Sequence, residues 1–151
     1  MMKLVSPAAV LAVFVLDRLT KAWTLEHLFS RSITVLPFFR LTYAENTGVA
    51  FGMFHGNNLF FVAVSVVLVA ALLYFRRRIR DLGLAAEAGL ALVLGGALGN
   101  LYDRLAYGFV VDFFDFSFFP AVFNVADSAI TAGAVLLAWG TRERNSGTGK
   151  A

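Results

Sequence analysis

Residues 59–75 form an unbroken apolar run, and this run restricts the possible folds more than any other stretch. It carries no charged side chain and a single aliphatic hydroxyl, Ser65, and arginines follow it at once at positions 76, 77, 78 and 80. As a helix it would be about 25 Å long, close to the ~30 Å thickness of a bilayer's hydrocarbon core. The whole chain is 59% hydrophobic and 15% charged, whereas soluble domains carry roughly 25% charged residues. The sequence therefore predicts an integral membrane protein.

Three further apolar segments are long enough to cross a membrane: residues 4–23, 84–102 and 121–139. Residues 24–57 are polar and aromatic, and their β-branched and aromatic clusters predict short strands at 33–36, 39–43 and 49–51. We therefore expect an all-α membrane protein with four transmembrane helices and a small extracytoplasmic β-containing loop domain between the first two. Residues 1–140 would form one domain, and residues 141–151 a disordered cytoplasmic tail.

The basic residues predict the orientation of these four spans. An even number of spans places both termini on one side, and that side would hold eight basic residues against five on the other. Lysine and arginine gather in cytoplasmic loops and ends. Both termini are therefore predicted to be cytoplasmic, and the loops at 24–57 and 103–120 to face outward.

The composition also argues against several kinds of chemistry. The chain has no cysteine, so it can use neither disulfides nor thiol catalysis. It has two histidines, His27 and His55, which disfavours a histidine-rich metal site. No interleaving of aromatic and basic residues suggests a nucleic-acid groove. The expected protein has no metal, no cofactor and no nucleic-acid partner.

Polar side chains gather near the outward ends of three predicted helices. Gly96, Asn100 and Asp103 share one face at helical spacing, as do Asp17 and Lys21 on the first helix. The fourth helix presents a third such face, formed by Asn124, Asp127, Ser128 and Thr131. Ionisable groups in membrane spans are costly and are functional candidates by default. We expect the three faces to line one shallow, outward-facing cavity.

Two aspartates in this region, Asp112 and Asp127, are the candidates for catalysis. They are too far apart in sequence to be neighbours on one helix, so they can meet only across the junction between the third and fourth spans. Two carboxylates brought together in a low-dielectric site cannot both ionise easily, and one pKa rises. The pair would then hold one base that activates water and one acid that protonates the substrate, which is the logic of an aspartic protease.

Simpler interpretations exist for several of the other polar residues. Asp17 with Lys21 is also consistent with a structural ion pair, and Asp103 with Arg104 with a local pair at a helix end. Gly95 and Gly99 have the spacing of a close-packing motif. Residues 46–48 have the composition of a turn, and Asp115 is expected to be solvated.

Five blocks of this sequence resemble the bacterial lipoprotein signal peptidase family, signal peptidase II. They occur in the family's order: DRLTK at 17–21, NTGVAF at 46–51, GGALGNLYDR at 95–104, GFVVDF at 108–113 and FNVADSAI at 123–130. The resemblance covers all but about the last ten residues. Val49 is a conservative departure from the alanine common in the family.

The resemblance implies an intramembrane aspartic endopeptidase of the bacterial inner membrane. It would remove the signal peptide from a prolipoprotein by cutting before a cysteine that carries a diacylglyceryl group, and it would work as a monomer among membrane lipids. Asp112 and Asp127 would form the catalytic dyad, with Asp17 and Lys21 in support. The residues implied to bind substrate or order the site are Asn46, Gly48, Asn100, Asp103, Arg104 and Asn124.

Other protein classes remain to be weighed against this one. Intramembrane aspartate and asparagine also line the paths of small ion- or proton-coupled transporters, although here the polar residues cluster at one membrane face. Asp103, Asp112 and Asp115 could suggest a metal-dependent lipid-head-group phosphotransferase. A structural membrane subunit would leave the two aspartates unexplained.

Overall fold

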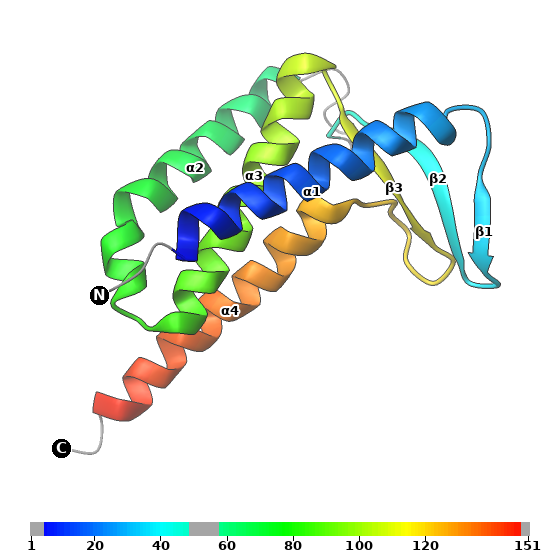
Figure 1. The fold of residues 1–151 in the computed structure, drawn as a ribbon. Coiled ribbons are helices and arrows are strands. Elements are labelled where there is room, and N and C mark those ends of the chain that lie inside the picture. The colour runs from blue at the N-terminus through cyan, green and yellow to red at the C-terminus, as the bar shows by residue number, and fades with distance from the viewer. Residues whose placement is uncertain (1–4, 49–57, 149–151) are drawn as a thin grey trace.

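The computed structural model describes residues 5–48 and 58–148 of the chain. Within these residues it contains four helices and a three-stranded sheet at one end of them (Figure 1). The elements in chain order are α1 (Val5–His27), β1 (Ile33–Leu36), β2 (Phe39–Asn46), α2 (Asn58–Arg80), α3 (Leu84–Ala106), β3 (Val110–Phe116) and α4 (Val125–Thr148).

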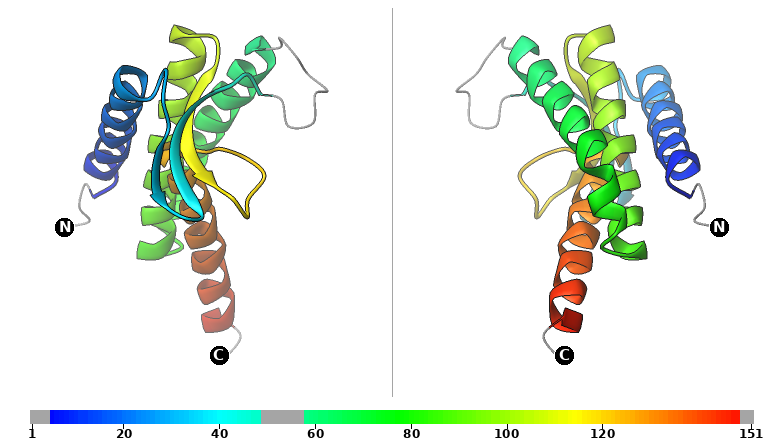
Figure 2. Two further views of the ribbon diagram at one scale, coloured as in Figure 1. Left: turned by 90° about the vertical axis from the view of Figure 1, so that its right-hand side faces the viewer. Right: turned by 90° about the vertical axis from the view of Figure 1, so that its left-hand side faces the viewer.

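Helix α3 is the centre of the helical bundle and packs against all three other helices (Figure 2). Its glycines make this possible, because an added Cβ at Gly95 would lie 2.7 Å from the Val13 side chain of α1. A Cβ at Gly96 would lie 2.5 Å from the backbone oxygen of Ala126 in α4. The expected close-packing role of the glycine pair at 95 and 99 is confirmed for both positions, since a Cβ at Gly99 would collide with the Asp17 carboxylate.

Helix α2 has the opposite character, since none of its residues is buried although the helix is strongly apolar. Such a surface is unstable in water and suits a lipid environment. Among the described residues, two helices, α2 and α3, are long and apolar enough to cross a membrane. Helix α1 carries four charged residues in its C-terminal half, Asp17, Arg18, Lys21 and Glu26, which makes its composition less decisive.

The sheet is antiparallel with β2 in the middle. The prediction of β1 is confirmed at residues 33–36, and β2 continues past the predicted 39–43 to Asn46. Strand β3 was not expected, because residues 103–120 were interpreted as a connection. The sequence VVDFFDF has strand-like composition, but its partner strand lies about seventy residues earlier. The β-structure is therefore built from both connections, residues 28–57 and 107–124, and not from the first alone.

The helix boundaries differ most from the predicted spans in the C-terminal half of the chain, in α3 and α4. α3 continues to Ala106 and α4 begins at Val125 instead of 121. α4 also continues to Thr148, so residues 141–148 are helical where a disordered tail was predicted. Residues 141–144 contain no glycine or proline, so nothing in them stops the preceding helix. The predicted strand at 49–51 lies outside the described residues.

The molecule has two ends, and the sheet forms one of them. The C-terminal ends of α1 and α3 and the beginning of α4 lie beside the sheet (Figure 1). The first turn of α1 and the last turns of α4 both lie away from the sheet, toward the opposite end. The predicted polar faces are all at the sheet end.

Candidate active site

Asp112 lies in the middle of β3 and its side chain is 1% exposed. The strand register places Asn46, at the end of β2, opposite Val110, and the Asn46 Nδ2 donates to the Asp112 Oδ2 at 2.9 Å. The Asn46 Oδ1 in turn accepts the backbone N–H of Gly48 at 2.9 Å. Gly48 has φ of 88°, a conformation that favours glycine. This turn fixes which way the Asn46 amide faces, so that its N–H groups point at Asp112.

Asp127 lies in the first turn of α4 and is half-buried. Asn124 caps this helix, since its Oδ1 accepts the Asp127 backbone N–H at 2.9 Å. The Asp127 Oδ2 accepts the Asn124 backbone N–H at 3.2 Å. The two residues thus form a reciprocal capping box. The cap holds the Asp127 carboxylate at the helix N-terminus, where the partial positive charge of the helix faces it.

The two aspartates meet at Asn124. Its Nδ2 donates to the Asp112 Oδ1 at 2.6 Å, while its other groups bind Asp127. A second amide completes the arrangement, because the Asn100 Nδ2 donates to the Asp127 Oδ1 at 2.8 Å. Each carboxylate therefore has an N–H donor on both of its oxygens.

The electrostatic surroundings of Asp112 favour its neutral form. Burial, and after it the nearby charge of Asp127, raise the pKa of Asp112 to about 7. The hydrogen bonds from Asn46 and Asn124 and the more distant charge of Lys21 oppose this rise. Desolvation wins because the side chain is sealed from water. A carboxyl with this pKa can hold or release a proton near neutral pH.

A buried ion cluster lies next to the two aspartates. The Lys21 Nζ contacts the Asp17 Oδ2 at 3.0 Å, the Asp103 Oδ2 at 2.9 Å and the Asn100 Oδ1 at 2.8 Å. Arg18 pairs with the Asp103 Oδ1 at 2.6 Å. The buried Lys21 and the partly buried Arg18 thus neutralise two buried carboxylates, and the three acceptors use all three N–H groups of the lysine. The predicted Asp17–Lys21 pair exists, within one helix, but it belongs to this larger cluster.

The ion cluster also binds the backbone beside each candidate aspartate. The Asp103 Oδ2 accepts the N–H of Val111, the residue before Asp112, at 3.1 Å. The Asp17 Oδ1 accepts the N–H of Ala126, the residue before Asp127, at 3.1 Å. Asp103 lies inside α3, which continues to Ala106, and it binds the β3 backbone as well as Lys21 and Arg18.

Arg104 lies against α2 on another side of the site. Its guanidinium is 5.4 Å from the centre of the Phe61 ring, and its backbone carbonyl accepts the Asn58 Nδ2 at 2.9 Å. It is close enough to interact electrostatically with both Asp127 and Asp112. Gly48 also packs on Phe61, where any Cβ would collide with the ring.

Two residues of this region were missed or wrongly assigned from the sequence. Arg18 was not singled out, although it lies between two residues that were, and its guanidinium covers the Tyr102 ring at 4.6 Å. Asp115 is not simply solvated, because its Oδ2 accepts from the Arg40 Nε at 3.1 Å across the β2–β3 pair.

The acidic residues do not gather in the way that a metal-dependent phosphotransferase would need. Asp103 is committed to Lys21 and Arg18, and Asp115 to Arg40. Within residues 5–48 and 58–148, no three histidine or acidic side chains converge as a metal-binding group.

Comparison with known proteins agrees with this fold and this arrangement of residues. Residues 9–142 match the family described as signal peptidase (SPase) II. The lipoprotein signal peptidase of Caldanaerobacter subterraneus subsp. tengcongensis is 47% identical over 136 residues, which cover 87% of this chain and 93% of the relative. That of Pelotomaculum thermopropionicum is 48% identical over 130 residues, 84% of each chain.

Two solved structures described as bacterial membrane enzymes share the fold. One superposes with a TM-score of 0.84 at 31% identity and covers 97% of this chain and 92% of its own. The other has a TM-score of 0.80 at 32% identity. Fold and sequence together define a membrane-embedded peptidase. The chain belongs to the signal peptidase II family.

Proposed function

We propose that this chain is an intramembrane aspartic endopeptidase that removes signal peptides from diacylglyceryl-modified prolipoproteins, cutting before the lipidated cysteine. Its catalytic dyad is Asp112 and Asp127. The observation that carries this proposal is the convergence of both carboxylates on Asn124, with an amide or backbone N–H on every carboxylate oxygen. The family match supports the substrate class.

We assign different roles to the two carboxylates. Asp127 is the more exposed of the pair and acts as the base. It takes a proton from a water molecule whose oxygen attacks the carbonyl carbon of the scissile peptide. Asp112, with its pKa raised to about 7, gives its proton to the carbonyl oxygen. The tetrahedral intermediate then collapses: one of its hydroxyl groups returns a proton to Asp112 as the C=O bond re-forms, the C–N bond breaks, and the leaving nitrogen takes from Asp127 the proton that came from water.

The neighbouring residues hold this arrangement in place. Asn46 and Asn124 orient Asp112, and Asn100 orients Asp127. Gly48 sets the Asn46 amide. Arg104 supplies positive charge toward both carboxylates and is the residue we assign to the polar part of the substrate. Asp17, Lys21 and Asp103 act through the backbone on either side of the dyad.

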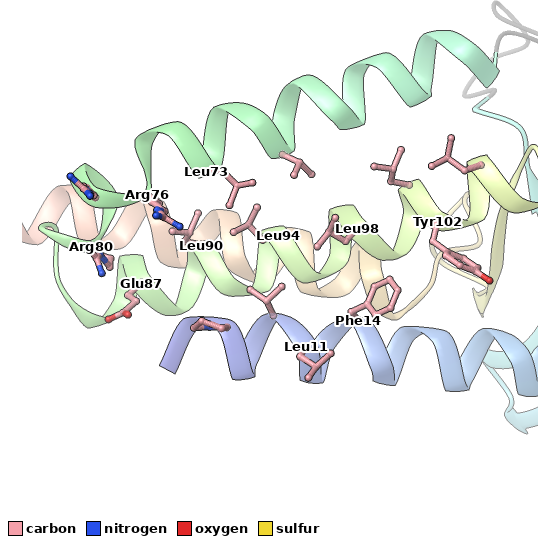
Figure 3. A pocket seen from close by; sticks show the side chains of 16 residues that line it. Leu11, Phe14, Leu73, Arg76, Arg80, Glu87, Leu90, Leu94, Leu98 and Tyr102 are labelled. Carbon is pink, nitrogen blue, oxygen red and sulfur yellow. The ribbon is translucent and has the colours of Figure 1, made fainter. Parts of the chain in front are cut away.

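We assign four transmembrane helices, with both termini in the cytoplasm and the dyad near the outer face of the bacterial cytoplasmic membrane. Two arginines at the C-terminal end of α2, Arg76 and Arg80, lie at the end of the bundle far from the sheet (Figure 3), as the positive-inside rule requires of a cytoplasmic end. The enzyme works as a monomer surrounded by lipid. Because the chain has no native cysteine, single cysteines at Ser32 and Thr141 can be labelled with an impermeant maleimide. Labelling of position 32 from outside and of 141 only after lysis is expected, and the reverse pattern would refute this orientation.

The decisive test is cleavage of a purified diacylglyceryl-modified prolipoprotein, followed as a gel shift with EDTA present. The wild-type chain should cleave it, while Asp112→Asn and Asp127→Asn should not. Equal cleavage by the variants would refute the assignment of Asp112 and Asp127 as the catalytic dyad. Loss of wild-type activity in EDTA, restored by a metal, would refute a metal-independent mechanism. A transporter, the alternative from the sequence, has no support in the family match.

A further inference from the structure

A long apolar groove runs along α3 between α1 and α2 (Figure 3). Its volume is about 970 Å³, the upper end of the ~300–1,000 Å³ usual for small-molecule sites. Leucines of all three helices line its length, among them Leu11, Leu73 and Leu94. At the end far from the sheet the lining becomes cationic, with Arg76, Arg77 and Arg80 of α2.

The groove lies on the wrong side of α3 for the scissile peptide. Asn100 points from α3 toward Asp127. Leu98 and Tyr102, which line the groove, are each two positions from Asn100 and therefore about 160° around the helix from it. A substrate segment lying in the groove would have the body of α3 between itself and the dyad.

The charge at the mouth of the groove also argues against the substrate's signal helix. Signal peptides begin with a positively charged segment ahead of their apolar stretch. In a membrane-spanning pose, that segment would meet Arg76, Arg77 and Arg80 at the cytoplasmic end. Like charges repel, and a single acidic lining residue, Glu87, faces three arginines. The mouth therefore suits an anion.

We propose that this groove binds one anionic glycerophospholipid from the leaflet opposite the dyad. Its phosphate lies at Arg76 and Arg80, since guanidinium groups bind phosphate through paired, charge-assisted hydrogen bonds. An acyl chain lies along the leucines of α2 and α3, including Leu73, Leu90 and Leu94. The lipid fills the space between α1 and α2 and ties both helices to α3. This site is separate from the dyad and does not depend on its catalytic assignment.

The test is native mass spectrometry of the purified chain in detergent, titrated with dioleoyl phosphatidylglycerol or dioleoyl phosphatidylcholine. The wild type should retain one phosphatidylglycerol in preference to phosphatidylcholine. Arg76→Gln and Arg80→Gln should each weaken phosphatidylglycerol binding by about fivefold, the usual value of one arginine toward an anionic lipid. Arg78→Gln is the matched control, because Arg78 does not line the groove and lies over the Phe75 ring at 6.0 Å.

A second variant tests the apolar part of the site. Leu73→Trp keeps every arginine but fills the groove beside the acyl chain, and it should displace phosphatidylglycerol while leaving the chain folded. Glycerol phosphate, which has the headgroup without the chains, should not compete. Equal loss in Arg76→Gln and Arg78→Gln would mean that only surface charge attracts the lipid. Unchanged lipid binding with a raised KM for the prolipoprotein in Leu73→Trp would make the groove a substrate path. Either result overturns the proposal.

Discussion

The carboxylate of Asp103 accepts the backbone N–H of Val111 at 3.1 Å. Val111 is the residue immediately before Asp112. The same relationship holds for Asp127, the other member of the proposed dyad, since Asp17 accepts the N–H of Ala126 at 3.1 Å. Asp17 and Asp103 are joined through Lys21. One buried ion cluster therefore fixes the backbone next to both proposed catalytic residues, and the distance between those residues depends on it.

Asp112→Asn and Asp127→Asn should each reduce turnover by more than about 10³-fold, because each removes a proton-transfer group from the transition state. The amide has nearly the same shape, so the chain should remain folded in the membrane. The measurement is prolipoprotein cleavage at saturating substrate. Asp115→Asn is the matched control on the same strand, where it should cost at most the ion pair with Arg40. Appreciable turnover in either dyad variant would count against the assignment.

The raised pKa of Asp112 predicts how activity depends on pH. Its folded-state pKa is about 7, and the acid role requires the protonated form. kcat/KM should therefore decline above about pH 7, with a tenfold loss for each further pH unit. A profile that is flat from pH 7 to 9 would show that Asp112 is not the acid.

The same shift predicts how stability depends on pH. The pKa of Asp112 is raised in the fold from its ordinary 3.8, so folding favours the protonated form. That contribution is complete below about pH 4 and is lost as the pH rises through 7. The melting temperature of Asp112→Asn, relative to that of the wild type, should therefore rise between about pH 4 and pH 7. Above pH 7 the difference between the two should stay constant. A constant difference between the two from pH 4 to 8 would contradict the buried, neutral carboxyl.

Asn124→Ala should reduce kcat on the order of 10²-fold, because a small displacement of reacting groups is costly. The substitution removes the α4 cap, worth about 1 kcal/mol, and the donor to Asp112. That donor lowers the pKa of Asp112, so the alkaline limb of the pH profile should move upward. The control is Asn58→Ala, which removes a comparable side-chain hydrogen bond, from the Asn58 amide to the Arg104 carbonyl. This variant should keep kcat near the wild-type value. If the alkaline limb of the pH profile is unchanged in Asn124→Ala, Asn124 acts only as a helix cap and does not influence the pKa of Asp112.

Asp17→Asn should act mainly through stability. It leaves the buried Lys21 and the partly buried Arg18 facing one carboxylate, and breaking a buried pair costs about 3–5 kcal/mol. The melting temperature should fall on the order of 10 °C. Glu26→Gln is the control on the same helix, since that side chain is 77% exposed, and it should melt as the wild type does. A normal melting curve with an inactive enzyme would move Asp17 into the catalytic site itself.

Gly96→Ala should separate the first turn of α4 from α3, because the new Cβ would lie 2.5 Å from the Ala126 carbonyl oxygen. Overpacking of this kind costs about 1–3 kcal/mol, and here it also displaces Asp127. Gly89→Ala creates a similar clash, 2.6 Å from the Gly133 oxygen, farther along the same helix pair. Both variants should lose stability, but Gly96→Ala should lose much more kcat. Equal losses of kcat would mean that the α4 start is not held at its catalytic distance by this contact.

The sequence alone determined that the protein lies in a membrane, which family it belongs to, and which residues could carry out its chemistry. A charge-free run at 59–75 followed by arginines can be stable only in a membrane or a large core, and five ordered polar blocks are too specific to arise by chance. Helical spacing correctly placed Asn100 and Asp103 near one another, because helix geometry is local.

The tertiary structure decided how those residues meet. Asn46 reaches Asp112 across 66 positions and Asp17 reaches Ala126 across 109, and no local periodicity records contacts of that range. Strand β3 exists because β2 supplies its partner, and Asn124 joins the dyad because a helix starts there beside a buried strand. Burial, which raises the pKa of Asp112, is likewise a property of the packed molecule and not of any one segment.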